Sequence, residues 1–169
     1  PPTLNLPDRS INEDSGNNAN LTNLWDYAND TWTLPQNLVY TILNQSNTTV
    51  ANCIITANQW IDCSTPTLDA FGTSTIIVQA FDGVLSTNDT FTLTIAPVND
   101  PPVFNVTIPT IAFAEDTNYT FNVSDYFYDV DNQLSQLTCT NSTIGNMTVQ
   151  YFKTGNLTEV RLTSAANFT

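Results

Sequence analysis

The sequence predicts an all-β protein built from tandem β-sandwich domains, on three observations. Apolar and polar residues alternate along residues 76–80 and again along residues 91–95, which is the period of half-buried strands. No segment shows a sustained 3.6-residue apolar period with capping residues, so no strong helix is expected. The chain also repeats its own motifs after about a hundred residues, the size of one small sandwich domain.

The repeat begins at a paired proline. The segment PPTLNL at residues 1–6 returns as PPVFNV at residues 101–106, and Glu13-Asp14 returns as Glu115-Asp116. We therefore expect a first domain at residues 1–99 and a second at residues 100–169.

The last two strands of the first domain are the clearest in the chain. Ile76, Val78 and Ala80 alternate up to a turn at Asp82-Gly83, and the alternation resumes at Phe91. The second repeat reaches Thr169 before any counterpart of these strands, so it is expected to be truncated and its apolar core half covered. The expected core residues of the second repeat are Ile111, Phe113, Phe121, Val123, Leu137, Val149 and Leu162.

Three cysteines are present. Cys53 and Cys63 bracket a short segment that reads as a hairpin turning at Ala57-Asn58, which can bring the two sulfur atoms into bonding range. A disulfide here would stabilise the fold by about 2–3 kcal/mol. The alternative is two separate buried thiols. Cys139 has no partner in the sequence.

Charge and composition exclude several functions. The net charge is −13 with three cationic side chains, so neither nucleic acid nor an anionic membrane surface is an expected partner. The chain has no histidine, which removes the commonest general base and transition-metal ligand. It has no glycine-rich phosphate loop and no apolar run of membrane-spanning length. We expect a non-enzymatic interior piece of a longer protein.

Acceptor motifs for N-glycosylation, Asn-x-Ser/Thr, are in excess. The sequence has twelve, whereas composition alone would give roughly five. The excess favours an N-glycosylated extracellular protein of archaeal or eukaryotic secretion, although an Asn- and Thr-rich composition remains the alternative. The motifs begin at Asn20, Asn29, Asn44, Asn47, Asn88, Asn105, Asn118, Asn122, Asn141, Asn146, Asn156 and Asn167.

These motifs together resemble the cadherin-like, Ig-like tandem repeats of large prokaryotic, notably archaeal, cell-surface proteins. The junction APVNDPPVF at residues 96–104 is similar to the linker between such repeats. Leu68-Asp69, the strand that ends at Asp82-Gly83 and the Asp129-Val130-Asp131 element are similar to other motifs of the family. The resemblance covers essentially the whole chain.

The resemblance implies Ca²⁺ binding, because this ion takes six to eight oxygen ligands from several loops. It implies one site at the junction of the domains and a second at the outer end of the first domain, completed there by a preceding repeat. The implied junction ligands are Glu13, Asp69, Asn99, Asp100, Asp129 and Asp131, and the outer ligands are Asp30 and Asp82. The alternative is that these acids cap turns and solvate loops.

Three departures from the family pattern bear on this implication. Phe71 replaces an acid, Pro97 stands near the place of the leading linker Asp, and Trp32 occupies the first repeat's counterpart of Asp131. We expect the aromatic residues near the repeat starts to pack in the cores rather than to bind sugar. These residues are Trp25, Tyr27, Trp32, Tyr126, Phe127 and Tyr128.

The sequence therefore predicts a structural or adhesive surface protein, a repeat stalk, filament or surface-layer component stiffened by Ca²⁺ and N-glycans. Its expected partners are further copies of the repeat or neighbouring subunits. The alternative is a carbohydrate- or receptor-binding sandwich of an adhesin or extracellular hydrolase, which an exposed aromatic strip would favour.

Overall fold

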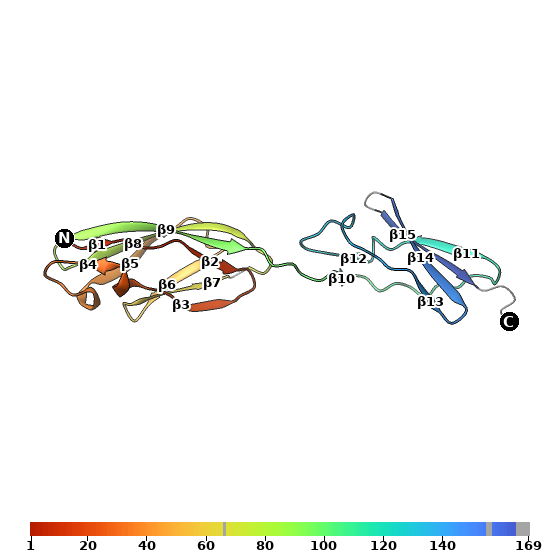
Figure 1. The fold of residues 1–169 in the computed structure, drawn as a ribbon, viewed down its shortest axis with the longest axis horizontal. Coiled ribbons are helices and arrows are strands. Elements are labelled where there is room, and N and C mark those ends of the chain that lie inside the picture. The colour runs from red at the N-terminus through yellow and green to blue at the C-terminus, as the bar shows by residue number, and fades with distance from the viewer. Residues whose placement is uncertain (66, 155–156, 165–169) are drawn as a thin grey trace. The chain divides into compact units, whose positions relative to one another are not determined.

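The computed structural model describes residues 1–65, 67–154 and 157–164. Contacts divide the chain into two compact units, Pro1–Val98 (unit 1) and Asn99–Thr169 (unit 2), which are described separately (Figure 1). The described residues form strands and two short 3₁₀ segments, so the all-β prediction is confirmed.

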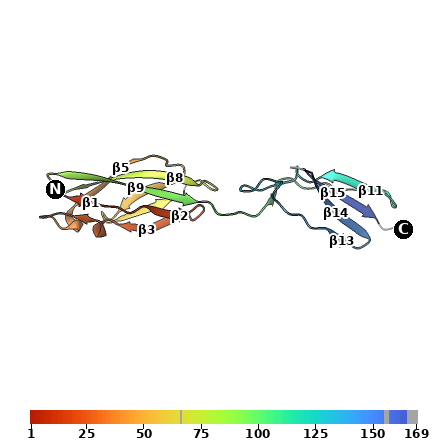
Figure 2. The ribbon, with the colours of Figure 1, turned by 45° about the horizontal axis from the view of Figure 1, so that its top comes forward.

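Unit 1 is a sandwich of two sheets (Figures 1 and 2). The larger sheet has the order β2-β9-β8-β5, with β2 parallel to β9 and the other pairs antiparallel. Its strands are β2 (Arg9–Asn12), β5 (Val39–Gln45), β8 (Gly72–Phe81) and β9 (Ser86–Ala96). The smaller sheet, of order β3-β7-β6, consists of β3 (Asn17–Asn23), β6 (Asn52–Thr56) and β7 (Trp60–Ser64).

Short elements close one end of this sandwich. Strand β1 (Thr3–Leu4) pairs with β4 (Ala28–Asn29), and the 3₁₀ segments η1 (Leu24–Asp26) and η2 (Pro35–Asn37) lie in the loops on either side of β4. In η1, the Asn23 side chain accepts a hydrogen bond from the backbone N–H of Trp25 at 3.3 Å, as expected of a capping residue.

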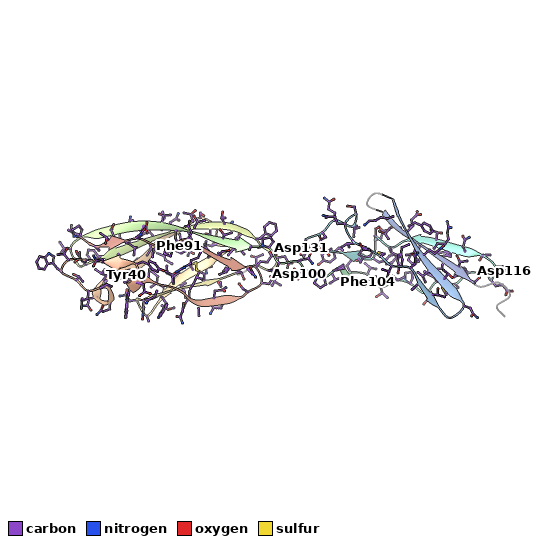
Figure 3. All side chains as sticks on the ribbon, in the orientation of Figure 1. Tyr40, Phe91, Asp100, Phe104, Asp116 and Asp131 are labelled. Carbon is purple, nitrogen blue, oxygen red and sulfur yellow. A yellow bond between two sulfur atoms is a disulfide. The ribbon has the colours of Figure 1, made fainter. Side chains whose placement is uncertain are left out.

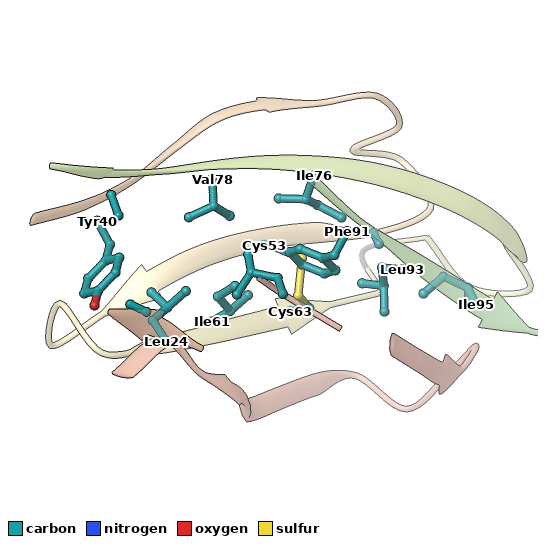
Figure 4. Close-up of a cluster of buried hydrophobic side chains, with 14 of the residues drawn as sticks. Leu24, Tyr40, Cys53, Ile61, Cys63, Ile76, Val78, Phe91, Leu93 and Ile95 are labelled. Carbon is teal, nitrogen blue, oxygen red and sulfur yellow. A yellow bond between two sulfur atoms is a disulfide. The ribbon is translucent and has the colours of Figure 1, made fainter. Parts of the chain in front are cut away.

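The core of unit 1 lies between the two sheets (Figure 4). The alternation of β8 and β9 is as predicted: Ile76, Val78 and Leu93 are 0% exposed, and Phe91 is 1% exposed. Ile61, Cys53 and Cys63 face them from the smaller sheet, and Leu24 comes from η1. Burying a side chain of this size stabilises the fold by about 1.5–3 kcal/mol, so β8 and β9 supply a large share of the core.

The hairpin of β6 and β7 carries the disulfide. Cys53 and Cys63 are direct cross-strand partners, and their sulfur atoms are bonded at 2.11 Å. The strands turn at Ala57 and Asn58, which both have a φ of 51°. Asn tolerates this left-handed backbone better than most residues. Cys139 is a free, partly buried thiol.

Unit 2 repeats part of this architecture. β10 (Val103–Phe104) pairs with β12 (Phe127–Tyr128), as β1 pairs with β4. The order β11-β15-β14 matches β3-β7-β6, and a further strand, β13, lies beside β14. These strands are β11 (Asn118–Asn122), β13 (Ser142–Ile144), β14 (Met147–Thr154) and β15 (Leu157–Ser164).

Backbone hydrogen bonds outside the strands repeat as well. In unit 1 the Leu24 N–H donates to the Gln59 carbonyl at 2.8 Å, and in unit 2 the Val123 N–H donates to the Thr158 carbonyl at 2.9 Å. Likewise, the Asn5 N–H donates to the Tyr27 carbonyl in unit 1 and the Asn105 N–H to the Tyr126 carbonyl in unit 2, each at 3.0 Å. The internal sequence repeat is thus also a repeat of structure over these segments.

The core of unit 2 is small. Val123, Val149 and Val160 are buried, and Phe121 and Leu162 pack against them partly exposed. Val123 and Val149 are therefore the two expected core residues that belong to the buried cluster. The described residues of unit 2 contain no counterpart of the sheet β2-β9-β8-β5.

Candidate cation sites at the ends of the units

Glu13 is a buried carboxylate at the end of unit 1 where β9 leaves the sheet. Its side chain is 2% exposed, and its Oε1 accepts a hydrogen bond from the Val98 N–H at 2.8 Å. Its own N–H donates to the Ala96 carbonyl at 2.9 Å. Its second oxygen, Oε2, is buried and has no hydrogen-bond partner among the residues the structure describes. A buried carboxylate oxygen without a partner is costly, which a bound cation would offset.

Asp14 and Asp69 lie beside each other in the same unit. The Asp69 N–H donates to Asp14 Oδ1 at 3.2 Å, and both residues are left-handed with a φ of 56°. Asp116, the counterpart of Asp14, has the same φ. Sequence reasoning chose Asp69 but missed Asp14, although the repeated Glu-Asp pair was a signal that could have found it.

The start of unit 2 gathers four of the expected ligands (Figure 3 labels Asp100 and Asp131). The Asp100 N–H donates to Asp131 Oδ2 at 2.6 Å, and the Asn132 side-chain amide donates to Asn99 Oδ1 at 2.9 Å. The same amide also donates to Asp129 Oδ1 at 3.0 Å. Asn132, which sequence reasoning did not select, thus joins Asn99 to Asp129.

Asp129 organises this loop. Its Oδ1 accepts the backbone N–H groups of Asp131 at 3.0 Å and Asn132 at 2.7 Å. Its Oδ2 is buried, with no hydrogen bond from any residue in the described parts of the chain. One oxygen therefore fixes the turn and the other remains able to bind a cation.

Asp30 makes the same turn in unit 1. Its Oδ1 accepts the N–H groups of Trp32 and Thr33, each at 2.9 Å, and its side chain is 2% exposed. Its Oδ2 lies 3.6 Å from the amino group of Pro1. The hydrogen bond from Trp32 is the main cause that lowers the pKa of Asp30 below its usual value.

Asp82 lies at the same end of unit 1, in the turn between β8 and β9. Its Oδ1 accepts the N–H groups of Val84 at 2.8 Å and Leu85 at 2.7 Å, and Gly83 takes the positive φ of 101° that this turn requires. The hydrogen bond from Leu85 is the main cause that lowers the pKa of Asp82, while the negative charge of Asp30 opposes the shift. Both carboxylates are thus kept ionised, as a cation site requires.

The expectation that Trp32 packs in a core is wrong. Trp32 is 92% exposed, because it lies in the bend after Asp30, outside both sheets. Tyr128 is also 50% exposed, whereas Trp25 and Tyr27 pack against the core of unit 1 as expected. Trp32 shares its end of unit 1 with the exposed side chains of Val84 and Leu85, which follow Asp82.

The implied junction ligands of unit 2 lie together, whereas in unit 1 Asp69 contacts Asp14 rather than Glu13. Glu13 and Asp69 belong to unit 1, and Asn99, Asp100, Asp129 and Asp131 belong to unit 2. A single site that joins the two groups stays a prediction. Asp30 and Asp82 both belong to unit 1, where the negative charge of Asp30 acts on the pKa of Asp82.

Most of the expected glycosylation sites are accessible. The Asn47 and Asn122 side chains are half-buried, and Asn156 and Asn167 lie outside the described residues. The exposed acceptors are Asn20, Asn29, Asn44, Asn88, Asn105, Asn118, Asn141 and Asn146.

Comparisons with known proteins identify the fold. No family model and no curated protein matches the chain. Extracellular cadherin domains 3–6 of protocadherin gamma B2 match 99% of the chain with a TM-score of 0.58 and 11% identity. The human desmocollin-1 ectodomain matches 98% with a TM-score of 0.51 and 16% identity. The chain therefore has a cadherin-like β fold.

The chain spans 40% of that protocadherin structure and 34% of the desmocollin structure. An endo-fucoidan hydrolase of glycoside hydrolase family 107 also matches, at 17% identity and a TM-score of 0.48, over 98% of this chain and 24% of the hydrolase. Across the described residues, no helix is long and apolar enough to cross a membrane.

Proposed function

We propose that the chain is a two-repeat stretch of an extracellular structural or adhesive protein, stiffened by Ca²⁺ at the ends of its units and covered by N-glycans. The observation that carries the Ca²⁺ proposal is the turn made by Asp30 in unit 1 and Asp129 in unit 2. In each turn Oδ1 accepts two backbone N–H groups; Oδ2 of Asp129 is buried without a hydrogen bond from the described chain, and Oδ2 of Asp30 is buried 3.6 Å from the Pro1 amino group. Turn capping needs the first oxygen only, so it does not explain the burial of the second.

The donor set fits Ca²⁺ rather than a transition metal. Carboxylate and amide oxygens are the available ligands, and the chain has no histidine. Asp129, Asp131, Asn99 and Asp100 would contribute oxygens at the start of unit 2, and Glu13, Asp14 and Asp69 at the end of unit 1. The ion would supply positive charge that holds these loops in one arrangement.

Calcium binding is tested by thermal unfolding of the 169-residue chain in about 1 mM Ca²⁺ and in chelator, a concentration suited to extracellular modules. We expect Ca²⁺ to raise the Tm of the wild-type chain. Asp129→Asn should abolish the rise, because it can keep the turn through its amide oxygen but removes the charge.

Asp125→Asn is the matched control, since it removes an exposed acid of the same unit. It should keep the Ca²⁺ response. A Tm that is the same with Ca²⁺ and with chelator would contradict the proposal.

The extracellular location is supported by the disulfide, the excess of acceptor motifs and the extracellular cadherin domains among the similar structures. The proposed source is a prokaryote with sequon-directed N-glycosylation, in practice an archaeon. The intact mass of the native protein before and after deglycosylation tests whether the chain is N-glycosylated. We expect sugar on more than half of the twelve sites, whereas the mass of the bare polypeptide would refute it.

The exposed Trp32 favours the alternative, a carbohydrate- or receptor-binding module. Aromatic faces are common sugar-stacking surfaces, but the residues beside Trp32 are aliphatic rather than aromatic. A glycan array separates the two functions, because binding lost in Trp32→Ala and retained in Leu34→Ala would favour the alternative.

A further inference from the structure

The acceptor motif at Asn20 is divided between the surface and the interior of unit 1. The motif is Asn20-Leu21-Thr22 in β3, and Asn20 is exposed whereas Thr22 is 2% exposed. The Thr22 hydroxyl oxygen accepts a hydrogen bond from Arg9 Nε at 2.9 Å. The hydroxyl that completes the motif is therefore enclosed in the fold, although the asparagine is not.

The neighbouring strand β7 holds this motif in place. The Asn20 N–H donates to Asp62 Oδ1 at 2.6 Å. Thr22 is the cross-strand partner of Ile61, which is 0% exposed in the core. The disulfide joins β7 in turn to β6. Exposing the Thr22 hydroxyl therefore requires β3 to separate from β7.

The motif at Asn105 is the opposite case. Asn105, Val106 and Thr107 are all exposed, and they lie in an irregular segment that follows β10. The amide and the hydroxyl of this motif are thus both presented to solvent without any separation of strands.

N-glycosylation depends on the hydroxyl as well as on the amide. Glycan transfer forms a bond between the asparagine Nδ2 and the anomeric carbon of a phosphate-linked sugar donor. The bond from that carbon to the phosphate oxygen breaks, and the phosphate and one amide proton are released. Because acceptor motifs require Ser or Thr two residues after the asparagine, the transferase has to reach that side chain too. In folded unit 1 it can reach Asn20 but not the Thr22 hydroxyl.

Given the proposed N-glycosylation of the chain, we propose that Asn20 receives its glycan only before unit 1 folds, so that its occupancy is set by a competition between glycan transfer and folding. Asp62 follows Asn20 by 42 residues. At about 5–20 residues per second, synthesis leaves the motif open for roughly 2–8 s before β7 is made. A glycan added in this time fits the folded unit, because the Asn20 side chain is exposed.

The test uses the 169-residue chain produced without glycans, a purified sequon-reading transferase and its lipid-linked sugar donor. One sample is folded. A second is reduced and alkylated at Cys53 and Cys63, which are 1–2% exposed, so that the added groups do not fit the core. Leu93→Asp, which places a charge at a 0% exposed position, gives another unfolded unit 1. Circular dichroism confirms each state. Peptide mass spectrometry should show modification of Asn20 at least about tenfold slower in the folded chain, and of Asn105 at similar rates in all samples.

Ala19→Thr is the matched control, because it creates an acceptor motif at Asn17 in the same strand with an exposed third residue. In the folded variant, Asn17 should be modified while Asn20 is not. Equal rates at Asn20 in folded and unfolded chains would overturn the proposal, as would no modification of Asn20 in either unfolded sample. Protection of Asn17 together with Asn20 would overturn the role of the Thr22 hydroxyl. Because the sugar is added in vitro, these outcomes are separate from whether the native protein carries glycans, which its intact mass tests.

Discussion

Asn58 joins the two sheets of unit 1 from the tip of the β6–β7 hairpin. Its Oδ1 accepts the Tyr40 N–H at 3.0 Å and its Nδ2 donates to the Leu38 carbonyl at 2.6 Å. Tyr40 lies in β5 and Leu38 directly precedes it, so one amide satisfies a donor and an acceptor at the start of this strand of the opposite sheet. The sequence indicates Asn58 as a turn residue, but a contact over this chain distance is visible only in the folded structure.

We expect Asn58→Ala to lower the free energy of unfolding by about 1–3 kcal/mol, because it leaves two partly buried backbone groups unpaired. Urea unfolding monitored by fluorescence measures this. Exposed Asn52→Ala should change stability by less than about 0.5 kcal/mol. Equal losses in both variants would contradict the role of Asn58.

Tyr40 makes stability depend on alkaline pH. Its side chain is buried and its hydroxyl donates to the Pro35 carbonyl, and burial raises its pKa from 10.0 to about 12. Because the folded-state pKa is the higher one, the contribution is present below pH 10 and is lost as pH rises toward 12. We expect stability to fall over this range, and to fall less steeply in Tyr40→Phe. Equal slopes for the two proteins would be inconsistent with this explanation.

At the scale of elements, two edge strands of unit 1 combine a bulge with a glycan acceptor. β3 shifts register between Asn18 and Thr22, around Asn20, and β5 shifts between Ile42 and Asn44. Bulges interrupt edge-to-edge pairing, and a glycan at the same place would add a steric block. Asn88, in contrast, lies on β9 where its pairing with β8 has no bulge.

We expect the double variant Asn20→Gln, Asn44→Gln of the glycosylated protein to self-associate more than wild type in sedimentation velocity. Asn88→Gln removes one acceptor from a strand without a bulge and should behave as wild type. If all three proteins sediment alike, these two acceptors do not protect the edges.

The elements also show how far the sequence could predict the structure. The strands β8 and β9 and the hairpin at Ala57-Asn58 were predictable, because apolar alternation and turn residues are local signals. The exposure of Trp32 was not predictable, because a residue in a loop is not part of an apolar alternation that would indicate whether it is buried. Asn132 was missed because its role follows from a side-chain contact with Asn99, whereas the repeated Glu-Asp pair could have indicated Asp14.

At the scale of the whole molecule, the chain is a repeated unit with acidic loops at its ends. One end of unit 1 carries Glu13 and Asp14, and one end of unit 2 carries their counterparts Glu115 and Asp116. Within unit 2, Asp116 lies at the end opposite to Asp100 (Figure 3). The Glu-Asp pair is thus repeated at one end of each unit. A repeat protein of this kind extends by adding units.

The measurement that tests this account most directly is small-angle X-ray scattering of the 169-residue chain with Ca²⁺ and with chelator. We expect Ca²⁺ to narrow the distribution of distances between the two units and Asp100→Asn to remove this effect, with both units still folded by circular dichroism. Asp125→Asn should respond as wild type. Identical scattering of the wild-type chain under both conditions would contradict the claim that Ca²⁺ stiffens the repeat.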